Sequence, residues 1–233
     1  MSITCRAVPA WLNRCMRFRR GLRRVRAYVR GAPGTYVWLG ILFVTTVVLH
    51  HMPPEFEERF LRHRSTNLHE LARSPVRVLV VSALWIEGGD WVPYAFLYTV
   101  FHAPAERWLG TLRWLAVCVL AHVLASLVSE GVLLRAIGEG LAPRSAVDTL
   151  DIGVSYALAG VIAVVAYRIA VPWRYGYLVT VLAVFGLPLA APGPTFTDFG
   201  HFGAALIGLA CYPLVRGRGK AWNPKETLAG FRG

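Results

Sequence analysis

Apolar runs long enough to cross a bilayer are the feature that most limits how this chain can fold. A transmembrane helix needs about 20 mainly apolar residues to cross about 30 Å of hydrocarbon, and only helices or closed barrels satisfy their backbone there. The runs do not alternate with a period of two, as barrel strands do. Charged residues make up 16% of the chain, against roughly 25% in soluble domains. The sequence therefore predicts an all-α, polytopic membrane protein.

Six candidate spans follow from these runs. They cover residues 35–51, 91–105, 110–134, 152–170, 173–191 and 196–215. The apolar stretch 76–86 is too short to cross alone and leads into the second span, so we expect a re-entrant or interfacial segment there. We divide the chain into a basic tail (1–33), a six-span membrane domain (34–216) and a basic C-terminal tail (217–233).

The charge of the loops predicts the orientation of these spans. Lys and Arg accumulate on the cytoplasmic side of short loops. With both termini cytoplasmic, the inner segments carry 18 of the 25 basic residues and two of the 13 acidic ones. An odd number of spans would place a basic terminus outside. We therefore expect both termini in the cytoplasm, and the enrichment in Arg, Ala and Val fits a bacterial plasma membrane.

The first 30 residues contain nine arginines and no acidic residue. A basic segment beside a membrane span typically faces anionic lipids, although basic patches also bind nucleic acid. We expect anionic lipids as partners and no nucleic acid. The cysteines have no C-x-x-C spacing, so we expect neither a disulfide framework nor a metal site, and nothing indicates an organic cofactor. These cysteines are Cys5, Cys15, Cys118 and Cys211.

Two polar residues near the start of spans are the candidates for chemistry. Ser155 lies three residues into the fourth span and His201 five residues into the sixth, and both spans run inward. At 1.5 Å per residue each lies roughly 5 to 8 Å below its helix start. A serine hydrogen-bonded to a histidine is the arrangement of an activated nucleophile and its base. Serine in a membrane helix also commonly serves packing, so the sequence leaves both interpretations open.

Small residues indicate that the fourth and sixth spans approach each other closely. Small residues spaced four apart let helix backbones come into contact. On the fourth span these are Gly153, Ala157 and Gly160, and on the sixth they are Gly200, Ala204 and Gly208. We expect this packing to bring Ser155 and His201 together.

The remaining polar residues have simpler interpretations. We expect His122, midway along the third span, to hydrogen-bond between helices, and Asp198 to cap the sixth span. His50, His51 and His102 are expected to anchor span ends at the membrane surface. The run 55–64 mixes charges with apolar residues at helical spacing and predicts an amphipathic interfacial helix.

Taken together, these features resemble the rhomboid family of intramembrane serine proteases. The matching pieces are the six-span layout, Gly153-Val154-Ser155 opening the fourth span, His201 in a Gly-rich sixth span, the motif E-R-W-L-G at 106–110 and the loop S-A-L-W-I-E-G-G-D-W at 82–91. The resemblance implies that Ser155 attacks the scissile carbonyl of a transmembrane client. It also implies that His201 takes and returns the proton, with no third acid needed.

Two positions differ from the usual family pattern. Tyr156 follows the serine directly, where the family usually has glycine, and the second span lacks the family's His-x-x-x-Asn pair in either alignment register. The side chains of that pair help to hold the oxyanion, and removing one such donor costs a factor of about 10² to 10³ in rate. The side-chain donors that remain are the hydroxyls of Tyr94, Tyr98 and Tyr156, and we expect Gly153 and Tyr156 to shape the site.

Three hypotheses follow. An active enzyme would cut transmembrane clients near their outer ends. A catalytically silent rhomboid-like protein would bind the same membrane clients without cleaving them. A small transporter has little support, because charged residues are missing from the span interiors and no inverted repeat is evident.

Overall fold

Each predicted span is occupied by helix in the computed structural model, which describes residues 10–219 and 221–229. The helices are α2 (Pro33–His50), α6 (Trp91–Leu97) continued by η3 (Tyr98–His102) and α7 (Ala103–Leu109), α8 (Thr111–Gly138), α9 (Val154–Val165) with η5 (Ala166–Arg168), α10 (Trp173–Ala190), and α11 (Phe196–Ala210) with α12 (Tyr212–Val215). Over the described residues the only β pairing is one isolated bridge between Ile169 and Trp222. The chain is an all-α membrane bundle.

Three of these helices are long and apolar enough to cross a membrane by length and composition: α2, α8 and α10. The segment Val154–Arg168 is apolar but shorter, and α11 has 15 residues. At 1.5 Å per residue, 15 helical residues extend only about 22 Å, less than the roughly 30 Å of the hydrocarbon core. The count of six crossings therefore stays a prediction.

The second predicted span is longer than the sequence indicated. Its helix runs from Trp91 to Leu109 without a break and includes a π-helical turn at η3. Glu106, which the sequence placed in a linker, therefore lies inside the helix. The helix ends where Gly110 adopts a φ of +84°, a conformation that favours glycine.

The segments between the first two spans form a chain of short helices. They are α3 (Pro54–Arg62), α4 (Leu68–Arg73), α5 (Pro75–Val81), η1 (Ser82–Leu84) and η2 (Glu87–Gly89). The predicted amphipathic run is confirmed as helical by α3, which buries Leu61 and carries acidic residues in its first turn and basic residues in its last. The predicted re-entrant stretch contains α5, whose Val78 is fully buried.

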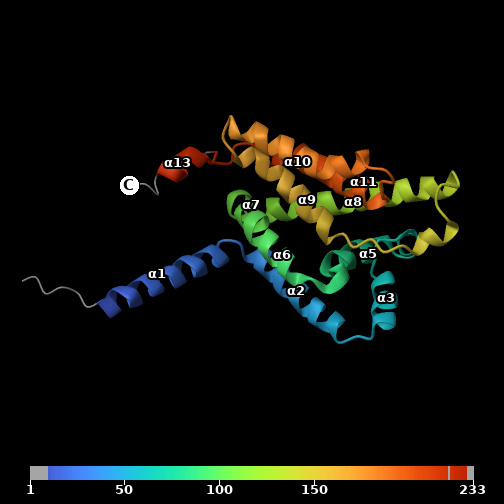
Figure 1. Cartoon of the computed structure of the whole chain (residues 1–233), viewed down its shortest axis with the longest axis horizontal. Helices are drawn as coiled ribbons and strands as arrows, with labels where there is room; N and C mark the ends of the chain where they lie inside the picture. The colour runs from blue at the N-terminus through green and yellow to red at the C-terminus, as the bar shows by residue number, and fades with distance from the viewer. Residues whose placement is uncertain (1–9, 220, 230–233) are drawn as a thin grey trace, which may run out of the picture.

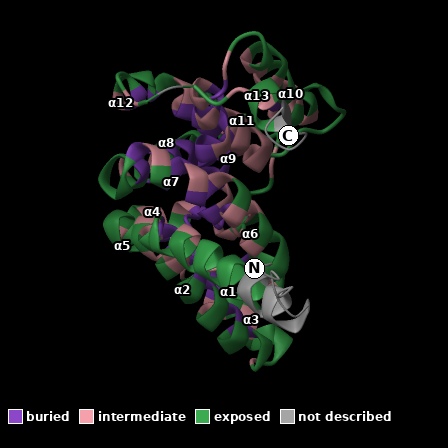
Figure 2. Cartoon of the chain, turned by 90° about the vertical axis from the view of Figure 1, so that its left-hand side faces the viewer, coloured by how far each residue is buried: buried purple, intermediate pink, exposed green. Residues whose placement is uncertain are grey.

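The basic N-terminal tail contains a helix that the sequence reading did not foresee. This helix, α1 (Ala10–Arg30), projects from one end of the bundle, and its described side chains are almost all exposed (Figures 1 and 2). Tyr28 fixes its end, because its hydroxyl donates to the carbonyl of Thr99 at 2.8 Å. Helix α13 (Pro224–Ala229) lies at the same end of the molecule as α1, whereas α3 lies at the other end (Figure 1).

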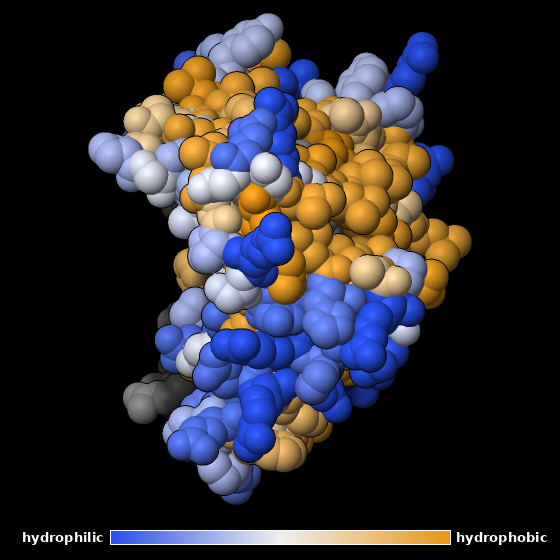
Figure 3. Space-filling view, turned by 90° about the vertical axis from the view of Figure 1, so that its right-hand side faces the viewer, coloured by the Kyte–Doolittle hydropathy of each residue, from blue (hydrophilic) through white to orange (hydrophobic). Residues whose placement is uncertain are grey.

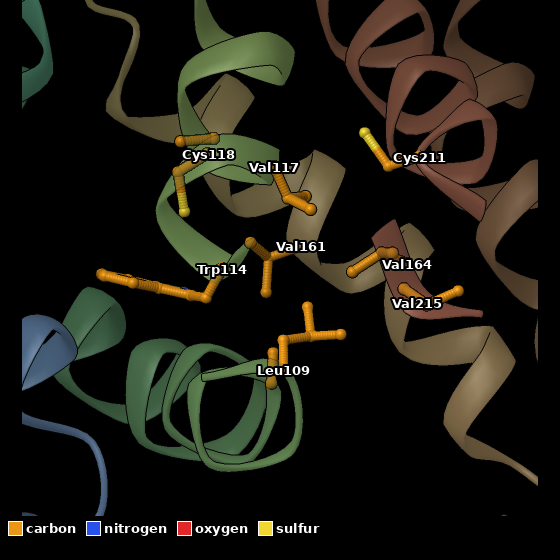
Figure 4. Close-up of a cluster of buried hydrophobic side chains, with 10 residues drawn as sticks. Leu109, Trp114, Val117, Cys118, Val161, Val164, Cys211 and Val215 are labelled. Carbon is orange, nitrogen blue, oxygen red and sulfur yellow. The ribbon is translucent and has the colours of Figure 1, made fainter. Parts of the chain in front are cut away.

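Buried residues concentrate where α7, α8, α9 and α11 meet (Figure 2). Side chains from these helices converge in one cluster, with Leu109, Trp114 and Val161 among its members (Figure 4). Cys118 and Cys211 belong to the same cluster and are free thiols. Cys5 lies outside the described residues.

The surface of the bundle is divided between polar and apolar areas. On the face that carries α3, hydrophilic side chains gather beside a continuous hydrophobic surface (Figure 3). Large exposed apolar side chains occur along the helices of the predicted spans, for example Val119 of α8 and Val179 of α10, which are 50% and 68% exposed. Burying such surface in lipid is favourable, as expected for a membrane protein.

Candidate functional site

Ser155 is the second residue of α9, and a glycine turn positions it there. Gly153 forms the N-cap of α9, and a β-carbon at this position would overlap the imidazole of His122. His122 belongs to α8, and its imidazole holds the Gly153 turn in place, because Nδ1 lies 3.1 Å from the carbonyl oxygen of Gly153. Its Nε2 lies 2.7 Å from the carbonyl oxygen of Leu79. The interhelical role predicted for His122 is thus confirmed.

His201 lies in the second turn of α11, and a capping box fixes the start of that helix. Thr195 is the N-cap, and the side chain of Asp198 accepts hydrogen bonds from the Thr195 backbone at 2.8 Å and hydroxyl at 2.7 Å. The capping role predicted for Asp198 is confirmed.

The structure brings Ser155 and His201 together. Oγ of Ser155 lies 2.9 Å from Nε2 of His201, within hydrogen-bonding distance. The close approach of α9 and α11 makes this contact available, since a β-carbon on Gly208 would overlap the backbone of Gly160. A β-carbon on Gly160 would in turn lie 3.3 Å from the carbonyl oxygen of Ala204. The close packing expected from these small residues is therefore present.

Tyr156 supports the histidine but is not placed to donate to an oxyanion. Its ring packs edge-on against the imidazole of His201, with centroids 4.9 Å apart. Its hydroxyl donates to Oδ1 of Asp151 at 2.7 Å and lies 3.0 Å from Oγ of Ser129. We therefore correct the expectation of an oxyanion donor at Tyr156, because its hydroxyl is already engaged. Its expected role in shaping the site stays a prediction.

Asp151 is the centre of the buried polar network behind the site. Its Oδ2 accepts from the hydroxyl of Thr66 at 3.1 Å, and its backbone N–H donates to Oγ of Ser65 at 2.8 Å. Burial raises the pKa of Asp151 to about 6, although its hydrogen bonds from Tyr156 and Thr66 oppose the shift. The network joins the segment just before α4, at Ser65 and Thr66, to the start of α9.

A cavity of about 390 Å³ opens at the Ser155–His201 pair. Its walls are Glu87, Gly88, Tyr94, Ile152, Ser155 and His201. Of the three tyrosines considered as donors, Tyr94 is the one that lines this cavity. Tyr98 is fully buried, and its ring stacks on that of His102 with centroids 3.9 Å apart. Among the described residues no group of three or more His, Cys, Asp and Glu is arranged to hold a metal ion.

Two expectations about polar residues in the spans were wrong. His102 is completely buried rather than interfacial, and it accepts a hydrogen bond from Nε1 of Trp114 at 3.2 Å. The π-helical turn puts its ring against Tyr98 inside the bundle. The span interiors also contain charge-bearing residues, since Glu130 of α8 is 2% exposed and Glu106 of α7 is 1% exposed.

Sequence reasoning missed the role of Glu106. Its carboxylate accepts from the backbone N–H groups of Gly34 and Thr35 at 2.8 and 2.7 Å, and from the hydroxyls of Thr35 and Thr111 at 2.8 Å each. It therefore satisfies the free N–H groups at the start of α2. The acidic residue four positions before Gly110 was noticed only as part of a motif, and nothing local indicated which helix it would cap.

Sequence reasoning also missed Glu87, which was placed in a loop without a function. The signal available was its place in the loop 82–91, which was matched to the family's loop leading into the second span. Burial raises the pKa of the Glu87 carboxyl.

In this all-α membrane bundle a serine and a histidine contact each other at the wall of one cavity. The comparison with protein families gives the class of the chain. The family model for rhomboid-like proteins matches residues 27–221, and the chain belongs to that family. No curated protein and no solved structure matched the chain.

Proposed function

We propose that this protein is an intramembrane serine endopeptidase that cleaves transmembrane clients. The observation that carries the proposal is the 2.9 Å contact between Oγ of Ser155 and Nε2 of His201, at the wall of a cavity of about 390 Å³. Two separate helices supply the pair, so both residues are held by packing.

The chemistry uses the chain's own groups. Ser155 transfers its hydroxyl proton to Nε2 of His201 as Oγ attacks the scissile carbonyl carbon. The tetrahedral intermediate collapses to an ester on Ser155, and the imidazolium returns the proton to the leaving amine. Water then attacks the ester carbonyl with His201 again as base, which releases the acid product and restores the hydroxyl of Ser155.

The negative charge on the tetrahedral intermediate needs hydrogen-bond donors. The first helical hydrogen bonds of α9 are those from Tyr156 and Ala157 to the carbonyl of Gly153. The N–H groups of Val154 and Ser155 precede them and are free of helical partners by position. The hydroxyl of Tyr94 is the side-chain donor in the same cavity, and it takes the place of the missing His-x-x-x-Asn pair in this proposal.

A specific observation favours a second candidate, a silent rhomboid-like protein that binds membrane clients without cutting them. The hydroxyl of Tyr156 is engaged by Asp151, so only Tyr94 remains among the candidate side-chain donors. Loss of one oxyanion donor costs a factor of about 10² to 10³ in rate. Such a protein would retain clients in co-purification after Ser155→Ala and His201→Ala.

We also propose that both termini face the cytoplasm of a bacterial plasma membrane and that α1 contacts anionic lipids. Its six described arginines are exposed: Arg19, Arg20, Arg23, Arg24, Arg26 and Arg30. Juxtamembrane Lys and Arg near an anionic surface contribute about 1 kcal/mol each. The position of α1 and α13 at one end of the molecule supports termini on the same side (Figure 1).

Cleavage in proteoliposomes tests the protease proposal. Purified protein is reconstituted with a panel of single-span model clients, and products are followed by mass spectrometry. The wild type is expected to cut at least one client, and Ser155→Ala should abolish that cut. Ser126→Ala is the matched control, since Ser126 is also a buried serine in a span helix but does not line the cavity. Undiminished cleavage by Ser155→Ala would refute the proposal.

A further inference from the structure

The cavity beside the Ser155–His201 pair is lined by one acidic side chain, that of Glu87. The cavity residues besides the Ser155–His201 pair are Gly88, Tyr94, Ile152 and Glu87. Glu87 is thus the only carboxylate that lines the space into which a client would enter. The proton-transfer chemistry derived above makes no use of it.

The position of Glu87 is fixed by its surroundings. The preceding residue, Ile86, is 1% exposed and belongs to a hydrophobic cluster that includes residues of α2 and α9. The two following glycines have φ values of +76° and +71°, which glycine adopts without strain. A β-carbon on Gly89 would lie 2.7 Å from the imidazole of His50. The η2 turn is therefore packed against α2.

The carboxylate of Glu87 has no counter-charge within the described part of the chain. The ion pairs found there are Arg62–Glu58, His63–Glu70, His69–Asp148 and Arg135–Glu139, and none involves Glu87. Glu87 is an exposed residue that lines the cavity and takes part in none of these ion pairs, so its carboxylate is available to an incoming cation.

We propose that the cavity binds a basic side chain of the client, Lys or Arg, with Glu87 as its counter-ion. The inference rests on the proposed function, because it names the client side chain that this same site takes. Ile152 offers an apolar wall for the methylene stem, which such side chains bury while the charged head finds polar partners. The ring of Tyr94 adds an aromatic surface of the kind that attracts cations. Hydrogen bonds between charged partners are the strong ones.

Equilibrium binding tests this inference without requiring catalysis. The probe is p-aminobenzamidine, a cation whose fluorescence rises in an apolar site, and p-aminobenzamide is its neutral analogue. Full-length protein in detergent is titrated as wild type, Glu87→Gln and Asp90→Asn. Asp90 is the matched control, because it belongs to the same loop but does not line the cavity.

We expect saturable binding of the cation to the wild type and to Asp90→Asn, and at least about tenfold weaker binding to Glu87→Gln, as the loss of one charged hydrogen bond predicts. The neutral analogue should bind all three proteins equally. Equal binding of the cation to wild type and Glu87→Gln would overturn the inference, and so would no binding to the wild type.

The two proposals fail in distinguishable ways. Labelling of Ser155 by a neutral fluorophosphonate without any Glu87-dependent binding of p-aminobenzamidine would overturn the cation site and leave the protease standing. Glu87-dependent binding without labelling of Ser155 would support the cation site and count against catalysis. The control is thermal unfolding of Glu87→Gln. A midpoint equal to that of the wild type would show that the lost binding does not come from misfolding.

Discussion

The ring of Tyr156 packs edge-on against the imidazole of His201, with centroids 4.9 Å apart and planes at 66°. The same side chain donates its hydroxyl proton to Asp151 at 2.7 Å. Tyr156 thus connects the histidine of the site to the buried polar network behind it. Tyr156 stands directly after Ser155, where the family usually has glycine, and these two contacts give its side chain a physical role.

Replacing Tyr156 by Phe should separate the two roles of the side chain. The ring against His201 is retained, while the carboxylate of Asp151 loses one of its donors. Leaving a buried polar group unsatisfied costs about 1 to 3 kcal/mol, so the free energy of unfolding should fall by that amount. Tyr175→Phe is the control, since Tyr175 is 62% exposed, and chemical unfolding in mixed micelles measures both. Equal stability of Tyr156→Phe and wild type would contradict the network.

The raised pKa of Asp151 predicts how stability depends on pH. Its pKa is about 6 in the folded protein, because of burial, against 3.8 for the free side chain. Between these values the folded protein holds a proton that the unfolded chain has lost, so stability falls as pH rises from about 4 to about 6. The full effect is about 3 kcal/mol, at 1.36 kcal/mol per pKa unit.

Asp151→Asn removes this titration. Unfolding free energies measured from pH 3.5 to 7 should therefore show a smaller fall across that window in the variant than in the wild type. Parallel pH profiles for the two proteins would show that the carboxylate of Asp151 does not titrate with a raised pKa.

Glu106 should be among the most sensitive positions for stability. Its buried carboxylate accepts four hydrogen bonds at the start of α2 and α8, and hydrogen bonds to charged groups contribute about 1.5 to 3 kcal/mol each. Glu106→Ala should lower the unfolding free energy by about 3 kcal/mol or more. Glu139→Ala should change it by less than about 1 kcal/mol, because its ion pair with Arg135 is exposed. A similar loss in both variants would contradict the capping role.

The contact between α9 and α11 can be tested with two glycines of one helix. A β-carbon on Gly208 would overlap the backbone of Gly160, whereas one on Gly203 would meet a methyl group of Val128 at an ordinary 3.7 Å. Gly208→Ala should destabilise the protein by about 1 to 3 kcal/mol. Gly203→Ala should leave stability unchanged or raise it by up to about 1 kcal/mol, the gain in helix propensity. Thermal unfolding measures the difference, and tolerance of Gly208→Ala would refute the close packing.

The sequence was most informative about features that follow from the residue pattern of individual helices, including which helix faces can pack closely. Apolar length located the six helical segments, spacing of small residues indicated the contact of α9 with α11, and the acidic residue near the start of α11 indicated its cap. The proximity of Ser155 and His201 also followed, because both lie at similar depth on helices that must pack closely.

The features that the sequence did not reveal depend on contacts between segments that lie far apart in the chain. Glu106 caps a helix more than 70 positions earlier in the chain, as the 72-residue separation of its bond with Gly34 shows. The hydroxyl of Tyr156 was free to be an oxyanion donor until the fold placed Asp151 beside it. Glu87 became a site residue only because the η2 turn, which packs against α2, lines the same cavity as Ser155 of α9. His102 was misjudged because a π-helical turn, which hydropathy does not reveal, directs it inward.

Activation of Ser155 by His201 is tested most directly by labelling the purified protein with a fluorophosphonate, which reacts with activated serines. Wild type, Ser155→Ala and His201→Ala are compared in detergent beside a proven rhomboid protease, and the modified residue is identified by mass spectrometry. We predict labelling of Ser155 in the wild type and its loss in both variants. Absence of labelling in the wild type while the reference protease reacts would contradict an activated serine at this site.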